Sequence, residues 1–514
     1  MELRRRKGQK TLAMAVAVGA AACLGRTALA LDYYVDTTYG GANGAAYTVN
    51  GKTYAGAYNS VSAALGAGGV GNGSSALNPN RVYFAAGTYN VGTSSLAVST
   101  RNLALIGLTN NPNDVVITST LDAAYNGGST TLGTTNCSTI QLKGNNVSAA
   151  NITFANSTDT PYIVNNAHAA VTPSGTYTGN AQTSTAPAVA LLLQGDEQVL
   201  NNVKVLGYQD SLYMKGGRVL ITNSYISGDN DFIFANSTVV ISNSIINMDG
   251  DHIGGAVTAA STDKRTSNGF VFLNDTIQTS SAKGSIIDPL NAANANGAAV
   301  NSMYLGRPWG WQQAGGDAST VLVNNKITSA IKTVGWLAWN SNETNVSNGK
   351  NGGNPAEDSR YAEYNSMDLS GATLDVSGRV IWSHQLNATQ AAAYTTLNVF
   401  SSEYNASTNP GGYAWYDGGY PSGDNAAGSG LADINPSYSW PAFWGPRNIQ
   451  NDGAGNSTIT GNPAAYSDPT WTLGGNWDPT AQLATIPEPA SLGLLGGAMA
   501  IILCRRRDKS PKVR

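Results

Sequence analysis

An asparagine followed three residues later by valine or isoleucine recurs along the middle of this 514-residue chain. The pairs are Asn202/Val205, Asn223/Ile226, Asn243/Ile246, Asn274/Ile277 and Asn324/Ile327. The first two intervals are 21 and 20 residues, about one turn of a parallel β-solenoid, and the longer later intervals fit turns that carry loop insertions. Asparagine suits the bends between such strands because it tolerates a left-handed backbone and hydrogen-bonds its own turn.

The apolar segments are short and are separated by Gly, Asn, Ser and Asp, with little sustained helical periodicity. Strand-like runs include Leu103–Ile106, Val189–Leu193, Val239–Ile241 and Val321–Val323. A β-sandwich would place turns roughly every 8–12 residues, about half the observed period. We therefore predict an all-β protein that forms a solenoid, with a sandwich as the alternative.

Charge is distributed unevenly along the chain. The sequence holds 29 Lys and Arg against 32 Asp and Glu, a formal net charge of −3. Six basic residues lie at or before Arg26 and six at or after Arg505, whereas only three acids lie outside residues 31–486. The body is left with 17 basic and 29 acidic residues, or −12. This balance predicts no nucleic-acid partner, because phosphate binding needs a basic face.

The first 30 residues have the pattern of a secretory signal peptide. Basic residues between positions 4 and 10 precede an apolar stretch over residues 12–24, and Ala28-Leu29-Ala30 is a small-x-small cleavage pattern. We expect residues 1–30 to be removed on export, which makes Leu31 the first residue of the mature protein.

The last 28 residues, 487–514, have three parts. Pro487-Glu488-Pro489 is followed by an apolar run over residues 490–504 and then by Arg505-Arg506-Arg507. The run of 15 residues is short for a membrane-spanning helix, which needs about 20. The tail resembles the PEP-CTERM sorting signal of Gram-negative bacteria. That resemblance implies an exosortase-type sorting enzyme as a partner and a secreted, cell-surface or extracellular location, with a short membrane anchor as the alternative.

Two aspartates share the period of the repeat. Asp210 lies eight residues after Asn202, and Asp231 lies eight residues after Asn223. If each interval is one coil, the two carboxylates occupy the same position on adjacent coils, about 4.8 Å apart. Two carboxylates so close cannot both ionise freely, so one should act as an acid and the other as a nucleophile or base. Ordinary turn formation is the alternative for both.

Three motifs around these residues resemble those of pectin methylesterases. Gly207-Tyr208-Gln209-Asp210-Ser211-Leu212-Tyr213 is similar to their GYQDTLY, and Asp231-Phe232-Ile233-Phe234-Ala235 is similar to their DFIFG. Tyr304-Leu305-Gly306-Arg307-Pro308-Trp309 matches their YLGRPW without change. The resemblance covers roughly residues 33–405 and implies a right-handed parallel β-helix that hydrolyses galacturonate methyl esters in pectin through an aspartyl acyl-enzyme.

The resemblance also implies roles for individual residues. Asp231 would be the nucleophile, held by Arg307, and Asp210 would be the acid and then the base. Gln209 would stabilise the oxyanion. Four aromatic residues match positions that line the sugar-binding groove, with ordinary packing as the alternative: Tyr213, Phe234, Trp309 and Trp336. No cofactor and no metal are implied, and we expect a monomer that binds pectin.

The sequence departs from the family pattern at four places. The early GxYxE motif reads Gly87-Thr88-Tyr89-Asn90 here, without the glutamate. Pro187 stands where the family has the first glutamine of QAVAL, which removes a second oxyanion donor. Asn230 replaces a valine beside Asp231, and Ala235 replaces the glycine that follows DFIF. A catalytically impaired, surface-displayed polysaccharide-binding protein is therefore the alternative function, and methanol release separates the two.

The expected domain organisation follows from these features. Residues 1–30 form the signal peptide, 31–405 the β-helix catalytic domain and 487–514 the sorting signal. Residues 406–486 are rich in Gly, Asn, Ser and Pro but hold five tryptophans, so we expect either a spacer or a small annex. The histidines are scattered without the spacing of metal ligands, and no G-x-S-x-G motif of a serine hydrolase occurs.

Overall fold

The structure is a computed structural model that describes most of the chain between residues 30 and 486. The described ranges are 30–123, 132–158, 187–249, 254–262, 268–280, 297–309, 318–337, 360–380, 383–401, 415–416, 471–472 and 477–486. The predicted signal peptide, the sorting signal and most of residues 406–476 lie outside the described residues.

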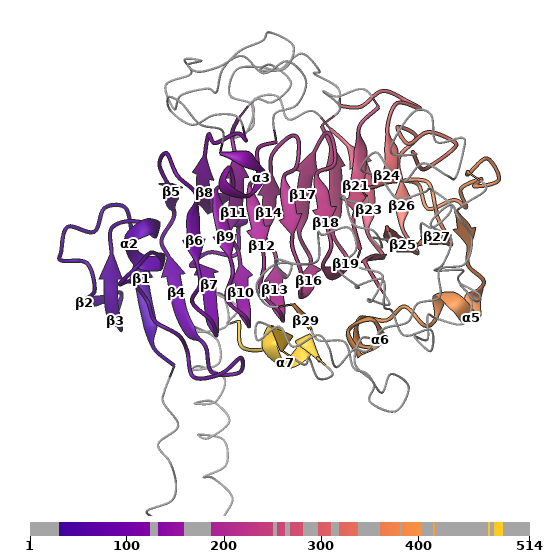
Figure 1. Cartoon of the computed structure of the whole chain (residues 1–514). Coiled ribbons are helices and arrows are strands. Elements are labelled where there is room, and N and C mark those ends of the chain that lie inside the picture. The colour runs from indigo at the N-terminus through magenta and orange to yellow at the C-terminus, as the bar shows by residue number, and fades with distance from the viewer. Residues whose placement is uncertain are drawn as a thin grey trace, which may run out of the picture.

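Within these ranges the strands form three long sheets, seen along the molecule in Figure 1. Sheet 1 contains, in spatial order, β2 (Ala45–Val49), β3 (Lys52–Tyr58), β1 (Asp32–Val35), β4 (Asn80–Phe84), β7 (Leu103–Gly107), β10 (Val147–Ala150), β13 (Gln198–Asn201), β16 (Arg218–Thr222), β19 (Thr238–Ser242), β22 (Phe270–Leu273), β25 (Ser319–Val323), β27 (Arg360–Tyr364) and β28 (His384–Gln385). Its strands pair in parallel, apart from the antiparallel hairpin of β2 and β3.

Sheets 2 and 3 are parallel throughout the described residues. Sheet 2 contains β26 (Lys326–Ile327), β23 (Thr276–Thr279), β20 (Ile245–Met248), β17 (Tyr225–Gly228), β14 (Lys204–Leu206), β11 (Thr153–Asn156), β8 (Val115–Ser119) and β5 (Gly87–Asn90). Sheet 3 contains β24 (Tyr304–Pro308), β21 (Ala256–Ala260), β18 (Ile233–Ala235), β15 (Leu212–Met214), β12 (Leu191–Leu193), β9 (Ile140–Leu142) and β6 (Leu96–Val98). The chain visits sheets 1, 2 and 3 in turn on each coil, so the fold is a parallel β-helix, as the repeat predicts.

The asparagines of the repeat lie at the bend from sheet 1 to sheet 2. All five have a left-handed backbone, with φ between 50° and 59°. Side chains of neighbouring bends also bond to one another: Asn202 Nδ2 donates to Asn151 Oδ1 at 2.8 Å, and Asn365 Nδ2 donates to Asn324 Oδ1 at 2.9 Å. The left-handed backbone expected of asparagine at these bends is confirmed, whereas these side-chain bonds join neighbouring coils rather than close the asparagine's own turn.

The aliphatic residues of the repeat form one interior row of sheet 2. Val205 pairs with Ile226, and the row continues through Ile246, Ile277 and Ile327. Each of these side chains is at most 1% exposed. The three-residue offset from the asparagine therefore places an aliphatic side chain inside the β-helix once per coil, which explains why the pattern recurs.

Short helices lie outside the sheets. They are α2 (Val61–Leu65), α3 (Gly133–Asn136), α5 (Ala388–Ala391), α6 (Thr396–Ser401) and α7 (Pro479–Leu483), together with the 3-10 turn η1 (Pro112–Asp114). A separate antiparallel pair joins β29 (Trp415–Tyr416) to β30 (Trp471–Thr472). None of the helices in the described ranges has the length and apolar character needed to cross a membrane.

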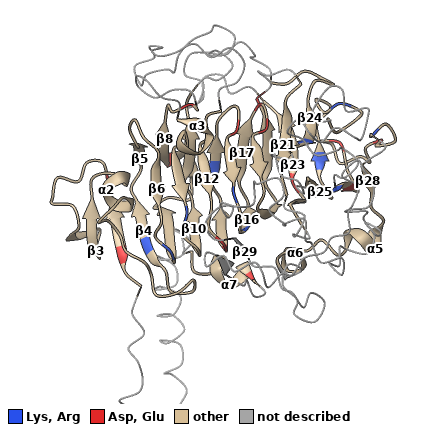
Figure 2. Ribbon diagram, in the orientation of Figure 1, with Lys and Arg blue, Asp and Glu red and all other residues tan. Residues whose placement is uncertain are grey.

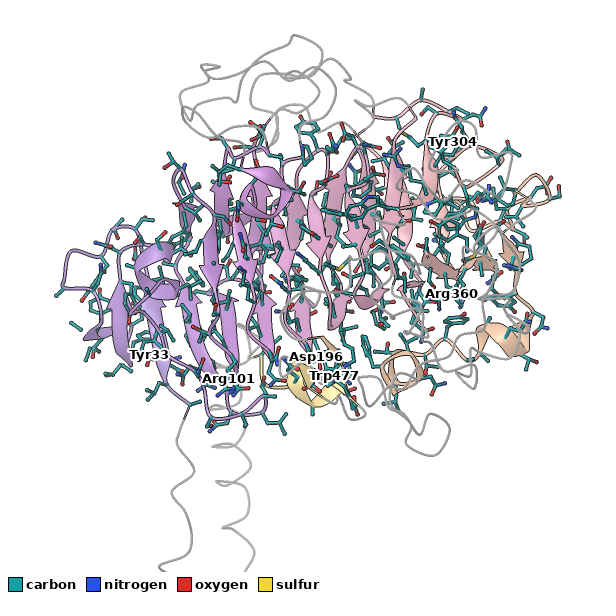
Figure 3. The ribbon with its side chains drawn as sticks, in the orientation of Figure 1. Tyr33, Arg101, Asp196, Tyr304, Arg360 and Trp477 are labelled. Atoms are coloured by element: carbon teal, nitrogen blue, oxygen red, sulfur yellow. The ribbon has the colours of Figure 1, made fainter. Side chains whose placement is uncertain are left out.

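Residues 477–486, at the end of the expected spacer, pack against sheet 1. In Figure 1, α7 lies beside β13 and β16. Trp477 is buried among the apolar residues on the outer face of this sheet, with its ring 4.6 Å from that of Phe400. Beneath Trp477, the buried Arg218 forms an ion pair with Asp196. Figure 3 shows Asp196 next to Trp477.

Candidate active site

Asp210 and Asp231 occupy equivalent bends on neighbouring coils. Asp210 lies between β14 and β15, and Asp231 lies between β17 and β18. Both have a left-handed backbone, with φ of 63° and 50°, a conformation that aspartate adopts more readily than most residues. Leu212 pairs with Ile233, which preserves the 21-residue spacing. The Asp210 N–H also donates to the Asn230 carbonyl at 3.1 Å, so the two bends are adjacent, as the spacing predicts.

Arg307 reaches Asp231 across the outer face of sheet 3. Its strand, β24, is two positions from β18 in the sheet. Arg307 Nε donates to Asp231 Oδ1 at 2.8 Å, and Nη2 donates to Oδ2. Two parallel bonds of this kind fit an ionised carboxylate and fix its orientation. Ala259 pairs with Arg307 on the intervening strand, and its short side chain leaves room for the arginine to cross.

The Asp210 carboxyl lies in a different electrostatic setting. The residue is 9% exposed, and burial raises the pKa of its carboxyl well above the ordinary value. The negative charge of Asp231 raises this pKa further, the positive charge of Arg307 lowers it, and the negative charge of Asp229 raises it. A carboxylic acid that keeps its proton near neutral pH can donate that proton to a leaving group.

Two glycines allow the chain to approach closely around these residues. A Cβ at Gly228, three residues before Asp231, would lie 2.2 Å from the Cβ of Phe232. A Cβ at Gly306, next to Arg307, would lie 2.0 Å from the Thr258 hydroxyl oxygen. Any larger residue would displace the bend that carries Asp231 or the strand that carries Arg307.

Three aromatic residues form a surface on sheet 3 next to the carboxylates. Tyr213 and Phe234 are paired neighbours on β15 and β18, and their rings stack with centroids 4.3 Å apart. The Trp309 ring is tilted against Phe234 at 5.7 Å. Trp309 is partly exposed, whereas Tyr213 and Phe234 are buried. The structure therefore brings three of the four expected groove residues together.

Trp336 lies apart from this surface. It is 1% exposed, belongs to the interior core and stacks on Tyr361 with ring centroids 4.3 Å apart. Its backbone forms a bridge to Gly306, so it supports the strand of Arg307 from the interior. A side chain this buried has no surface to offer a sugar, and the structure favours ordinary packing for it.

Gln209 and Pro187 lie on neighbouring coils. Gln209, which is partly exposed, directly precedes Asp210, and its carbonyl accepts a bond from the Ala188 N–H at 3.1 Å. Pro187, the residue before Ala188, is therefore next to Gln209 in space. Its own carbonyl accepts a bond from the Ala123 N–H at 2.8 Å. A glutamine at position 187 would therefore lie beside Gln209.

Asp229 is a residue that sequence reasoning misses. It is 2% exposed and acts electrostatically on Asp210. Acidic residues are common in turn-rich chains, so only its position two residues before Asp231 could have drawn attention to it. Its burial depends on the stacking of coils, which the local sequence does not reveal.

Charged residues occupy little of the described ribbon, most of which carries neither sign (Figure 2). Among the described residues, no group of three or more His, Cys, Asp or Glu side chains is placed to hold a metal ion.

Cys137, near the carboxylates, donates its thiol proton to the Pro187 carbonyl at 3.3 Å. Burial raises the pKa of this thiol, so it is a neutral packing group.

Comparison with known proteins identifies similar sequences. The sequence profile of the pectinesterase family matches residues 159–403. Pectinesterase 31 of Arabidopsis thaliana is 29% identical over 263 residues, which is 51% of this chain and 63% of that protein. A pectinesterase of Ralstonia solanacearum is 34% identical over 181 residues, which is 33% of this chain and 37% of that protein. The chain thus spans less than two thirds of the length of these curated relatives.

Solved structures show a similar fold. Pectin methylesterase PemA from Erwinia chrysanthemi is 26% identical, with a TM-score of 0.52 over 71% of this chain and 96% of that one. A pectin methylesterase in complex with a hexasaccharide is 27% identical, with a TM-score of 0.50 over 67% of this chain and 93% of that one. These structures match the parallel β-helix found here.

Proposed function

We propose that this chain, whose residues 159–403 match the pectinesterase family profile, hydrolyses galacturonate methyl esters in pectin and releases methanol. One observation carries the proposal: a carboxylate held by an arginine lies one coil away from a buried carboxyl whose pKa is raised. The first group is suited to attack a carbonyl carbon, and the second is suited to protonate the group that leaves.

In the first half of the proposed reaction, an oxygen of Asp231 attacks the ester carbonyl carbon. The bond to the methoxy oxygen breaks, and Asp210 gives its proton to that oxygen, so methanol departs and an acyl-enzyme anhydride remains. The bonds from Arg307 hold the nucleophile in the orientation needed for attack. Asp210 is now an anion.

In the second half, Asp210 accepts a proton from a water molecule, whose oxygen attacks the acyl carbon. The bond to Asp231 breaks, which releases a galacturonic acid unit and restores both aspartates to their starting states. The partly exposed amide of Gln209 stabilises the oxyanion that forms in each half. The partly exposed Trp309 offers a ring face beside the dyad for packing against sugars, and the buried rings of Phe234 and Tyr213 support it.

Replacing Asp231 with asparagine tests this proposal. The change removes the nucleophile with almost no change in volume, so methanol release from highly methylated pectin should fall by about 10³-fold or more. Asp210→Asn should be nearly as severe because the leaving group then lacks its acid. Methanol is measured directly, and circular dichroism verifies that the variants are folded.

Asp375→Asn is the matched control, since Asp375 lies in an exposed turn where its carboxylate accepts a bond from the Ser377 N–H at 2.9 Å. It should retain full activity. Rates like those of the wild type in folded Asp231→Asn or Asp210→Asn would refute the dyad. A wild-type protein that binds pectin without releasing methanol would instead support the impaired polysaccharide-binding protein.

We further propose that the chain is exported through residues 1–30 and sorted to the cell surface by an exosortase-type enzyme that acts on residues 487–514. The Pro487-Glu488-Pro489 motif, the apolar run and the terminal arginines support this. Changing Arg505, Arg506 and Arg507 to serine should leave uncleaved protein in the membrane fraction, as detected by mass spectrometry of the C-terminus. Unaltered processing would exclude recognition of the basic cluster.

A further inference from the structure

A third buried carboxylate adjoins the catalytic pair. Asp229 lies at the end of β17, in the bend that carries Asp231, and it is 2% exposed. Its N–H donates to the Tyr208 carbonyl at 3.1 Å, and the Asp210 N–H donates to the Asn230 carbonyl at 3.1 Å. These two bonds flank Gln209 and hold the segment from Asp229 to Asp231 directly alongside the segment that ends in Asp210.

The surroundings of Asp229 contain a further acid on the next coil. The Asp249 N–H donates to the Gly228 carbonyl at 2.9 Å, which places Asp249 beside Asp229. One Asp249 oxygen accepts bonds from the Ser227 hydroxyl at 2.7 Å and from the Asn247 amide at 2.9 Å. Asp229 therefore lies between a hydrogen-bonded carboxylate and Asp210.

The groups that face Asp210 come from several elements. Asp231 approaches from the bend before β18, Asp229 from the end of β17 and Arg307 from β24. Among the described residues, Tyr213 of β15 and the Cys137 thiol, next to α3, also lie near Asp210 and are neutral near pH 7 because burial raises the pKa of each. Arg307 is already bonded to Asp231, so these two charges largely offset each other at Asp210.

We propose that Asp229 is a positioning residue for the proposed esterase reaction: a third carboxylate whose negative charge keeps the proton on Asp210 until methanol leaves. The inference rests on the proposed function for its catalytic meaning, but the protonation of Asp210 can be observed without turnover. Asp229 touches neither the ester nor the leaving group in this account. It acts only through Asp210.

The expected direction follows from the sign of the charge. A nearby anion disfavours ionisation of a carboxyl, so Asp229 raises the pKa of Asp210. The first half of the reaction needs protonated Asp210, and activity is therefore lost on the alkaline side as this proton dissociates. Removing the charge of Asp229 should move the alkaline limb of the pH–activity profile to lower pH. The proposed catalytic groups themselves stay unchanged.

The experiment compares Asp229→Asn with the wild type in full pH profiles of kcat/KM for methanol release. The alkaline midpoint should fall by about 0.5–1 pH unit, the effect of one nearby charge. Asp229→Glu keeps the charge and should retain most of the wild-type midpoint. Asp249→Asn makes the same chemical change one coil farther away and should shift the midpoint less.

A second measurement does not depend on activity. The infrared band of the protonated carboxyl is assigned to Asp210 by its loss in Asp210→Asn, and its pH midpoint is then compared between the wild type and Asp229→Asn. A lower midpoint in the variant supports the inference even if methanol release is absent and the proposed function fails. Unchanged midpoints in a folded Asp229→Asn protein, by infrared or by kinetics, would overturn it.

Discussion

Pro187 is the residue at which this chain departs most directly from the expected chemistry, because it lies beside Gln209 on the neighbouring coil. Its N–H is absent and its side chain has no donor, so Gln209 is the only glutamine left for the proposed oxyanion site. Pro187→Gln should raise kcat for methanol release by up to about 10²-fold, the range for one oxyanion donor. Stopped-flow or steady-state assays of kcat at saturating pectin provide the measurement.

A suitable control for this substitution is Pro187→Leu, which removes the ring without adding a donor. It should not raise kcat. If Pro187→Gln folds stably and kcat does not increase, the missing donor does not limit methanol release.

At the scale of structural elements, a ladder of side chains joins the coils just after the asparagine bends. The backbone N–H of Ser224 donates to Ser244 Oγ at 3.0 Å, that of Ser244 to Asp275 Oδ1 at 2.7 Å, and that of Asp275 to Asn325 Oδ1 at 2.7 Å. Asp275 is the titratable member within this ladder. Burial raises the pKa of its carboxyl well above the ordinary value, and its Oδ2 has no hydrogen-bond partner.

Asp275→Asn should therefore stabilise the β-helix. The folded-state pKa lies above the unfolded value, so folding takes up a proton, and the stability contributed by Asp275 is lost as pH rises through that window. Asparagine does not titrate and keeps the acceptor for Ser244. It can also donate, as Asn325 Nδ2 does to the Phe272 carbonyl at 3.0 Å.

The expected gain for Asp275→Asn is about 1–3 kcal/mol at pH 8, the range for one unsatisfied buried polar group. It should shrink toward zero near about pH 3, below the ordinary aspartate pKa, where both states of the wild type are mostly protonated. Denaturant unfolding at the two pH values measures this difference. A variant that is less stable than the wild type at pH 8 would show that the carboxylate is needed in the ladder.

At the scale of the whole molecule, residues 477–486 close the outer face of sheet 1. Trp477 is 5% exposed, its ring lies 5.6 Å from the Arg218 guanidinium carbon, and Gln482 Nε2 donates to the Glu197 carbonyl at 3.1 Å. Trp477→Ala should weaken this docking by about 3 kcal/mol, and hydrogen exchange of α7 should accelerate while methanol release is retained.

Leu397→Ala is the matched control because Leu397 is 51% exposed on α6, and it should leave the exchange of α7 unchanged. Undiminished protection of α7 in Trp477→Ala would mean that the hydrogen bonds of Gln482 and its neighbours hold the segment without the indole.

The amino-acid sequence by itself determined the β-helix and the core of the candidate site. The asparagine bends and the aliphatic row depend on a period of about one coil, and that period is legible because each coil repeats the same local conformation. The adjacency of Asp210 and Asp231 follows from the same spacing. The link from Arg307 to Asp231 came from the resemblance of motifs, since 76 residues separate the pair.

Only the tertiary structure decided which side chains are buried and what they meet. Trp336 belongs to the interior, and Asp229 is enclosed between coils, although the local sequence around each gives no such signal. The docking of α7 joins Gln482 to Glu197 over 285 residues, within a stretch whose composition is that of a spacer. Local patterns encode bends and strand periodicity, whereas burial and long-range contacts depend on how the completed coils stack and on what covers them.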